Sequence, residues 1–305
     1  MLATTDSDPA RALREFKPAR KFFVGIDSDG CVFDSMEIKQ KECFAPMFIK
    51  HFHLQAASKY ARQTWEFVNL YSKTRGCNRF HALSRSLNLL RERPEVLARQ
   101  VAVADTKTLD EWTARESRPG NDTLAAEVKG GNKALEPVLE WSRAINTAVA
   151  DIVQGVPPFP LVRECLVRMA PEADIVVISQ TPGEALQREW AEHHLSSFAR
   201  LVAGQEMGTK TEHLKLAAAG KYPAEKILMI GDAPGDLKAA RANGVLFYPI
   251  VPNHEEHSWQ FLLDDALPRF FAGKYAGELE RRLLAEFEAT LPEDPPWIKN
   301  PGLGH

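Results

Sequence analysis

Two aspartates, two residues apart, follow a short apolar run near the start of the chain. The run ends at Asp27, and Asp29 and Gly30 come directly after it. A short apolar run that stops at polar residues and glycine is typical of a buried strand, expected here over residues 21–27. Carboxylates this close repel one another unless a cation or a shared proton lies between them. The pair therefore suits a bound cation or a shared proton, although Asp and Gly are also ordinary turn residues.

The elements that position this pair follow from the pattern of the rest of the chain. After residue 155, apolar runs alternate with helical patterns, and strands are expected at 175–178, 201–203, 227–230 and 245–247. Strands that alternate with helices predict a parallel α/β sheet with right-handed crossovers. Residues 36–154 show helical spacing and no convincing strand, which predicts a separate helical block.

Length and composition limit the classes of function. The chain has 305 residues, 44% of them hydrophobic, which suits one large domain or two with a sizeable core. A net charge of −3 favours neither nucleic acid nor an anionic membrane as partner. Four scattered cysteines, no apolar signal region and no membrane-length apolar run predict a cytoplasmic protein with reduced thiols. The sequence carries no signal for the oligomeric state.

Polar residues follow three of the expected strands, and a lysine begins the helix before the last of them. These residues are Asp27 and Asp29, Ser179, Asp232 and Asp236, and Lys210. The carboxyl ends of parallel strands meet at one edge of a sheet, so the side chains are expected to lie together. Carboxylates from two strands suit Mg²⁺, while a hydroxyl and an ammonium suit phosphoryl oxygens. An aspartate can also act as the nucleophile that forms an aspartyl-phosphate.

The order and spacing of these motifs resemble the haloacid dehalogenase (HAD) superfamily, in the branch of the phosphoglycolate phosphatases and β-phosphoglucomutase. The resemblance rests on Asp27-x-Asp29-Gly30-x-x-x-Asp34-Ser35, a strand that ends in Ser179, then Lys210, then Gly231-Asp232-x-x-x-Asp236. It covers residues 21–35 and 155–250, and it is the combination rather than any one motif that is specific.

The resemblance implies a role for each motif residue. Asp27 matches the nucleophile, and Asp29 matches the general acid/base. With an aspartate at the second position, the chain resembles the phosphatases and phosphomutases of the superfamily rather than its dehalogenases. Ser179 and Lys210 match the residues that hold the transferring phosphoryl group.

The resemblance also implies Mg²⁺ as the cofactor. Asp27 and Asp232 match its ligands, with the backbone carbonyl of Asp29 as a further ligand and Asp236 as a direct or water-mediated one.

The resemblance implies the domain plan as well. A Rossmann-like core (21–35 and 155–255) would carry an all-helical C1-type cap (36–154) inserted after the first strand, with an N-terminal arm (1–20) and a C-terminal helical extension (256–305). The cap is long for that type. Gln180 and Thr181 also depart from the Asn that is common after the second motif in phosphoglycolate-phosphatase-like members.

The expected substrate is a small phosphorylated metabolite, and four residues are candidates to contact it. They are Gln180, which follows the second motif, and the cations of a loop between two cap helices, Lys73, Arg75 and Arg79. The loop is equally typical of a solvated surface.

Two alternatives to a phosphatase remain open on the sequence. A phosphomutase or phosphonatase would use the same core, the latter with a Schiff-base lysine on the cap, for which Lys39, Lys50, Lys59 and Lys73 are candidates by location. A non-catalytic binding protein is the other alternative, and the complete set of carboxylates argues against it.

Overall fold

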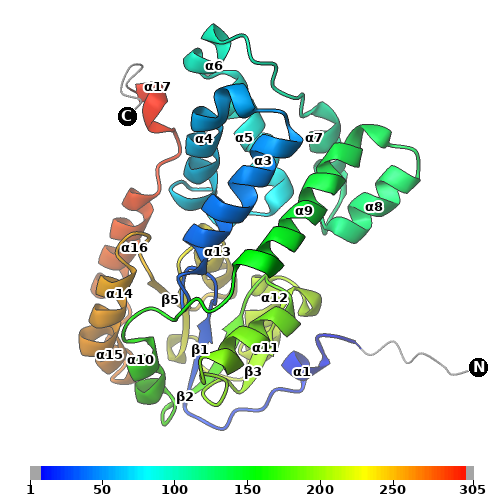
Figure 1. Ribbon diagram of the computed structural model, residues 1–305. Coiled ribbons are helices and arrows are strands. Elements are labelled where there is room, and N and C mark those ends of the chain that lie inside the picture. The colour runs from blue at the N-terminus through cyan, green and yellow to red at the C-terminus, as the bar shows by residue number, and fades with distance from the viewer. Residues whose placement is uncertain (1–7, 300–305) are drawn as a thin grey trace, which may run out of the picture. The chain divides into compact units, whose positions relative to one another are not determined.

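The computed structural model describes residues 8–299, which divide into two compact units. An α/β unit comprises the chain up to Asp34 and Gly155–Thr290. A helical unit comprises Ser35–Gln154 and the residues from Leu291 onward. Figure 1 traces the chain through both units. The predicted arm (1–20) and C-terminal extension (256–305) each lie partly outside the described residues.

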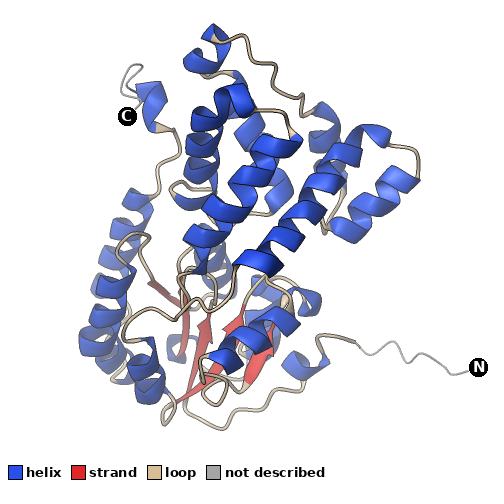
Figure 2. Ribbon diagram, in the orientation of Figure 1, coloured by secondary structure: helices blue, strands red, loops and turns tan. Residues whose placement is uncertain are grey.

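The α/β unit is built on a five-stranded parallel sheet in the order β3-β2-β1-β4-β5 (Figure 2). All five predicted strands are present, and the α/β fold is confirmed. Their bounds are β1 (Phe22–Ile26), β2 (Ala173–Ile178), β3 (Leu201–Ala203), β4 (Ile227–Gly231) and β5 (Leu246–Pro249). β1 lies at the centre with every residue buried, because it is covered on both faces.

The helices of this unit cover both faces and one edge of the sheet. Successive side chains of β1 point to opposite faces. Phe22 packs its ring 5.0 Å from that of Phe270, and Phe23 packs 5.4 Å from Tyr222 on the other face. The bounds are α1 (Arg11–Arg14), α10 (Val162–Met169), α11 (Gly183–Glu192), α12 (Lys210–Ala217), α13 (Pro234–Asn243), α14 (Glu255–Phe261), α15 (Leu267–Phe271) and α16 (Glu278–Thr290).

The C-terminal helices of this unit pack on the sheet. A π-helical turn, η6 (Leu262–Ala266), joins α14 to α15, and the buried Trp259 donates through Nε1 to the carbonyl of Cys31, 3.0 Å away. Glu280 of α16 accepts a hydrogen bond from the Phe247 amide of the edge strand β5. These helices therefore close the outer edge of β5 and hold the loop that follows β1.

The helical unit has a core of its own, rich in aromatic residues. Trp65 and Trp141 are fully buried with ring centroids 5.8 Å apart. The helix bounds are α2 (Ser35–Ile38), α3 (Ala45–His51), α4 (Ser58–Leu70), α5 (Arg79–Arg91), α6 (Pro94–Ala98), α7 (Lys107–Arg115), α8 (Asn121–Lys129), α9 (Glu136–Ile152) and α17 (Pro296–Lys299). A π-helical turn, η1 (Lys39–Phe44), joins α2 to α3.

The predicted C-terminal extension is shared between the two units. Its helices up to Thr290 belong to the α/β unit, and the segment after Leu291 belongs to the helical unit. In that unit Trp297 packs 4.2 Å from the guanidinium of the buried Arg93 and edge-on to Phe67. Cation–π and aromatic contacts thus hold this segment. Among the described residues, no helix combines the length and apolarity that crossing a bilayer requires.

A buried carboxylate forms a hydrogen-bond network at the amino end of the sheet. Asp174, at the start of β2, accepts hydrogen bonds from Tyr222 Oη (2.5 Å), Arg200 (2.6 Å) and the backbone amides of Ala19 and Arg20 (2.7 and 2.9 Å). Burial alone would raise the pKa of Asp174, but these donors together hold it below its usual value of 3.8. The network ties the segment before β1 to the sheet.

We expect Asp174→Asn to lower the free energy of unfolding by about 1–3 kcal/mol, because buried donors lose a charged acceptor. The folded-state pKa lies below the unfolded one, so this stability is present above pH 3.8 and is lost as the pH falls through the folded-state pKa. Thermal and chemical unfolding at several pH values measure it. Asp265→Asn, which breaks a surface pair with Arg269, is the control and should cost less than about 1 kcal/mol. Equal stability of Asp174→Asn and wild type at pH 7 would contradict this account.

Candidate active site

The carboxyl ends of β1, β2 and β4 bring the predicted residues to one edge of the sheet. Ile26 of β1 lies opposite Ile230 of β4 and Val177 of β2. The amide of Asp27 continues the ladder by donating to the carbonyl of Ile230, 3.0 Å away. Asp27 and Asp232 therefore leave adjacent strands side by side, and Ser179 leaves β2 at the same level.

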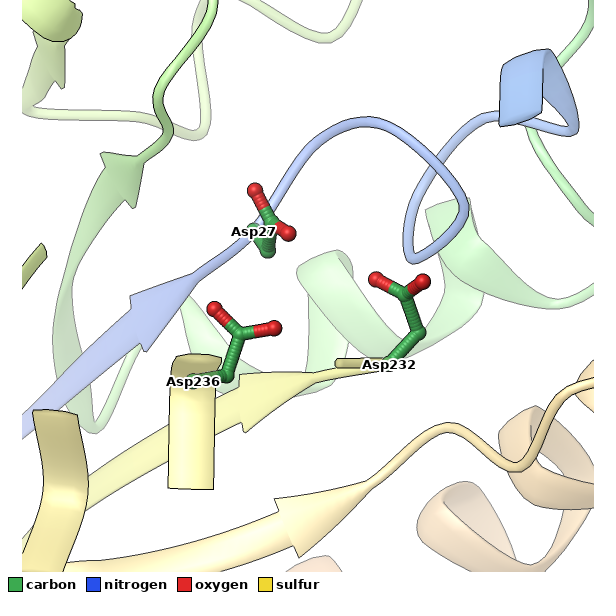
Figure 3. A group of neighbouring side chains, drawn as sticks. All are labelled: Asp27, Asp232 and Asp236. Carbon is green, nitrogen blue, oxygen red and sulfur yellow. The ribbon is translucent and has the colours of Figure 1, made fainter. Parts of the chain in front are cut away.

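Three carboxylates, those of Asp27, Asp232 and Asp236, form a buried cluster at this edge. They offer ligand oxygens that all lie within 4.8 Å of one another (Figure 3). Each residue is at most 4% exposed, so water screens the repulsion between the carboxylates only weakly. Asp27 follows β1, Asp232 follows β4, and Asp236 lies in the first turn of α13.

Lys210 supplies a cation to this cluster. Its Nζ donates to Asp27 Oδ2 at 2.7 Å and to Asp236 Oδ1 at 2.6 Å. Burial alone would lower the pKa of Lys210, but the two carboxylates raise it above its usual value. Burial is likewise the main cause that raises the pKa of Asp27 and of Asp236, and Lys210 opposes it. One ammonium among three carboxylates leaves negative charge in excess.

Lys210 is held at the start of α12 by a capping box. Thr209 accepts a hydrogen bond from the amide of Glu212, and Glu212 accepts one from the amide of Thr209. A lysine in the first turn faces the positive end of the helix dipole, which is mildly unfavourable. The contacts with Asp27 and Asp236 offset that cost.

Both carboxylate oxygens of Asp236 accept hydrogen bonds. Oδ2 accepts a hydrogen bond from the amide of Ala233, and Oδ1 accepts from Lys210. The carboxylate lies directly against Gly231, where an added Cβ would come within 2.4 Å of Asp236 Cγ. A glycine at this strand end is therefore what admits the carboxylate.

Asp29 lies beyond β1 on a tight loop and is half-buried. Gly30 has a φ of 74°, and its amide donates to the carbonyl of Phe33, which makes the sharp turn that the sequence predicts. The Asp29 side chain is outside the carboxylate cluster, and its Oδ2 accepts a hydrogen bond from Thr181 Oγ1 at 2.7 Å. The proposed metal contact of Asp29 is its backbone carbonyl, which stays a prediction.

The loop after β1 is also fixed from its other side, by Ser28 and its two partners Trp190 and Glu189, none of which the sequence motifs indicate. Ser28 is fully buried between the two aspartates and accepts a hydrogen bond from Trp190 Nε1 at 3.0 Å. Its hydroxyl also lies 3.3 Å from Glu189 Oε2. Alternation along an extended chain points Ser28 away from Asp27 and Asp29, and this period-two pattern is the signal that would have identified it.

Ser179 and Gln180 have different surroundings. Ser179 is 2% exposed, and its Oγ accepts a hydrogen bond from the amide of Thr181, so its own hydrogen can be donated to a phosphoryl oxygen. The Gln180 side chain donates to the carbonyl of Gly208, 3.0 Å away. Gln180 therefore braces two loops, and no contact favours it as a substrate residue.

The three predicted cations of the helical unit also differ from one another. Lys73 is exposed and pairs with Glu293, whereas Arg75 is buried and donates to the carbonyl of Leu70. Arg79 donates to the side chains of Ser142 and Asn146, both neutral. Burial lowers the pKa of Arg79 to about 10. Of the three, Arg79 is best suited to an anionic ligand.

Three of the four candidate Schiff-base lysines are exposed, and the fourth is half-buried. Lys50, Lys59 and Lys73 are all exposed, and Lys59 lies over the ring of Tyr60. Lys39 is half-buried in the η1 turn. A Schiff-base lysine is usually activated by burial or by a second cation, so these surroundings do not favour a phosphonatase.

The cluster of Asp27, Asp232 and Asp236 fits a hard divalent cation. All its ligand atoms are carboxylate oxygens, which Mg²⁺ prefers over nitrogen or sulfur. The excess of negative charge in the cluster also favours a bound cation.

Comparison with known proteins bears on the fold. No model of a protein family and no curated protein matches the sequence. The structure is similar to a haloacid dehalogenase-like hydrolase from Bacteroides fragilis, with a TM-score of 0.50, 16% identity, and coverage of 78% of this chain and 93% of that one. This chain has the haloacid dehalogenase-like fold. The HAD-like resemblance of its motifs is thus confirmed at the level of the fold.

Two further structures align with lower scores. One, from Lactobacillus delbrueckii subsp. bulgaricus, is described as a phosphoglycolate phosphatase, with a TM-score of 0.47, 14% identity, and coverage of 94% of this chain and 100% of that one. The other, a haloacid dehalogenase-like family protein from Streptococcus pneumoniae, has a TM-score of 0.43, 13% identity, and coverage of 78% and 90%.

We expect Gly231→Ala to disturb the cluster, because its Cβ would overlap Asp236 atoms at 2.4–2.5 Å. Overpacking of this kind costs about 1–3 kcal/mol of stability, measured by thermal and chemical unfolding. Gly235→Ala is the matched control, since nothing lies within 4 Å of a Cβ at that helical position. It should leave the protein as stable or slightly more stable. A Gly231→Ala protein as stable as the control would contradict the close approach.

Proposed function

We propose that this protein is a Mg²⁺-dependent phosphatase that removes phosphate from a small phosphorylated metabolite through an aspartyl-phosphate intermediate. The observation that carries the proposal is the buried cluster of Asp27, Asp232 and Asp236 with Lys210 bonded into it. The HAD-like fold supports the assignment, and hydrolases and phosphatases are named among the similar structures.

In the first step an oxygen of Asp27 attacks the phosphorus atom, and the bond from phosphorus to the leaving oxygen breaks. Asp29 donates its proton to that oxygen, so the product departs as an alcohol. The product of this step on the enzyme is an acyl phosphate on Asp27.

In the second step water attacks the same phosphorus atom. Asp29, now a carboxylate, accepts a proton from this water. The bond between phosphorus and Asp27 breaks, and inorganic phosphate leaves with Asp27 and Asp29 restored. The two steps together consume one phosphate monoester and one water.

Asp27, Asp232 and the Asp29 carbonyl would hold Mg²⁺, with Asp236 as a direct or water-mediated ligand. Bound there, the ion supplies charge neutralisation for the phosphoryl oxygens. Lys210 supplies a second positive charge and Ser179 a hydroxyl donor, and both would orient the phosphoryl group for in-line attack. Lys210 also keeps Asp27 and Asp236 close together before substrate binds.

We further propose a cytoplasmic location and a small anionic substrate, with neither nucleic acid nor membrane as partner. Four free cysteines, three of them buried, suit a reducing compartment. Arg79, surrounded by neutral acceptors, is our candidate for recognising a further oxygen-bearing group of the substrate.

We expect Asp27→Asn to lower kcat on the order of 10⁴-fold or more, because an amide does not attack phosphorus. Asp29→Asn should lower it about 10²–10⁴-fold and leave phosphorylated enzyme, because hydrolysis lacks its base. Steady-state rates with an aryl phosphate and intact-protein mass spectrometry measure these effects. Asp264→Asn, which changes an exposed carboxylate, is the control. Near wild-type turnover by Asp27→Asn would refute the mechanism.

We expect EDTA to abolish activity and Mg²⁺ to restore it. Asp232→Ala should weaken Mg²⁺ binding at least about tenfold, or ~1.4 kcal/mol, because it removes a charged ligand. Isothermal titration calorimetry measures this without relying on turnover, with Asp264→Ala as control. Full activity in excess EDTA, or unchanged Mg²⁺ affinity in Asp232→Ala, would contradict the proposed site.

A further inference from the structure

Thr181 connects the ends of two neighbouring strands through its side chain. It follows β2, whereas Asp29 follows β1, and Thr181 Oγ1 lies 2.7 Å from Asp29 Oδ2. The hydroxyl donates to Asp29 Oδ2, which can accept this bond both when the carboxyl group is ionised and when Oδ1 carries a proton. At 2.7 Å the bond has the usual length of an O–H···O hydrogen bond, so it orients the Asp29 carboxyl group.

The backbone around Thr181 is fixed on several sides. Its amide donates to Ser179 Oγ at 3.2 Å, and its carbonyl accepts from the amide of Gln205 at 3.1 Å. The preceding side chain, Gln180, donates to the carbonyl of Gly208. These bonds brace the loop after β2 against residues 204–208. The Thr181 hydroxyl therefore projects from a rigid support toward Asp29.

The two aspartates are held in different ways. Asp27 is buried and bonded to Lys210 and to the amide of Ser28. Asp29 is half-buried and lies beyond the strand, just before the turn at Gly30. Ser28 fixes the backbone between the two aspartates through Trp190. Thr181 restrains the Asp29 carboxyl group itself, through Oδ2.

We propose that Thr181 is a positioning residue for Asp29, which it holds by one carboxylate oxygen so that the other transfers the proton. The proposal rests on the proposed phosphatase function and deepens it. With Oδ2 engaged by Thr181, the proton that goes to the leaving oxygen comes from Oδ1 as the phosphorus–oxygen bond breaks. The same Oδ1 accepts the proton of the attacking water in the second step.

A residue that positions a general acid can be distinguished from one that only stabilises the fold, because only the first affects substrates according to their leaving group. A good leaving group, such as 2,4-dinitrophenolate, departs without protonation, whereas an alkoxide requires it. Because kcat/KM covers the steps up to departure of the leaving group, its dependence on leaving-group pKa reports how well Asp29 donates. A general structural disturbance would lower kcat/KM for all substrates by a similar factor.

The experiment compares Thr181→Val, which removes the hydroxyl at nearly constant size, with Thr181→Ser, which keeps it. We expect Thr181→Val to lower kcat/KM for alkyl phosphates on the order of ten- to a hundredfold. This loss is smaller than the whole contribution of a general acid, because Asp29 is still present but less well oriented. For 2,4-dinitrophenyl phosphate the loss should stay within about threefold, since that group needs no acid. Thr181→Ser should recover most of the loss. Thr290→Val, which alters an exposed threonine of the same unit, is the matched control.

Two variants separate the failure of this inference from the failure of the proposed function. Asp29→Asn should show the same dependence on the leaving group with larger losses, and Asp27→Asn should be inactive with every substrate. If both behave so, an equal loss for all substrates in Thr181→Val, or no loss, overturns the positioning role alone. A wild-type protein without phosphatase activity, or an active Asp27→Asn, overturns the phosphatase and the positioning role together.

Discussion

The ion pairs of the half-buried Lys210 with Asp27 and Asp236 are the interaction on which the site depends. Moving several carboxylates out of water costs several kcal/mol each unless a cation compensates them. Lys210 contacts Asp27 from β1 and Asp236 from α13, and it comes from α12 itself. It thus ties together three segments that are distant in sequence. One ammonium balances only part of the charge of three carboxylates, and the remaining negative charge would favour a further cation.

The sequence predicts much of this arrangement because parallel strands end at one edge of a sheet. That rule alone places Asp27, Ser179 and Asp232 together, and the five strands lie within a few residues of their predicted bounds. The rule does not predict which hydrogen-bond partner each side chain has. Gln180 is engaged by the carbonyl of Gly208, and this partner depends on the packing of two loops. Thr181, at first only a departure from a family pattern, contacts Asp29 for the same reason.

The helical unit was less predictable for a related physical cause. Helical periodicity shows which faces are apolar, but the partners of a charged side chain come from distant helices. Arg79 at the start of α5 bonds to Ser142 and Asn146 of α9, and Arg75 turns back to the carbonyl of Leu70. The segment after Leu291 lies in this unit because Trp297 packs against Arg93. No local pattern in the sequence indicates that contact.

Buried carboxylates at the two ends of the sheet have different hydrogen-bond donors and opposite pKa shifts. At the amino end, Asp174 receives hydrogen bonds from Tyr222, Arg200 and two backbone amides, and its pKa is lowered. At the carboxyl end, Asp27 and Asp236 share one lysine, and burial raises the pKa of both. Asp174 has four donors and a lowered pKa, whereas Asp27 and Asp236 each accept from one backbone amide and share one lysine. This difference in donors and in the direction of the pKa shift distinguishes the proposed catalytic carboxylates from the structural one.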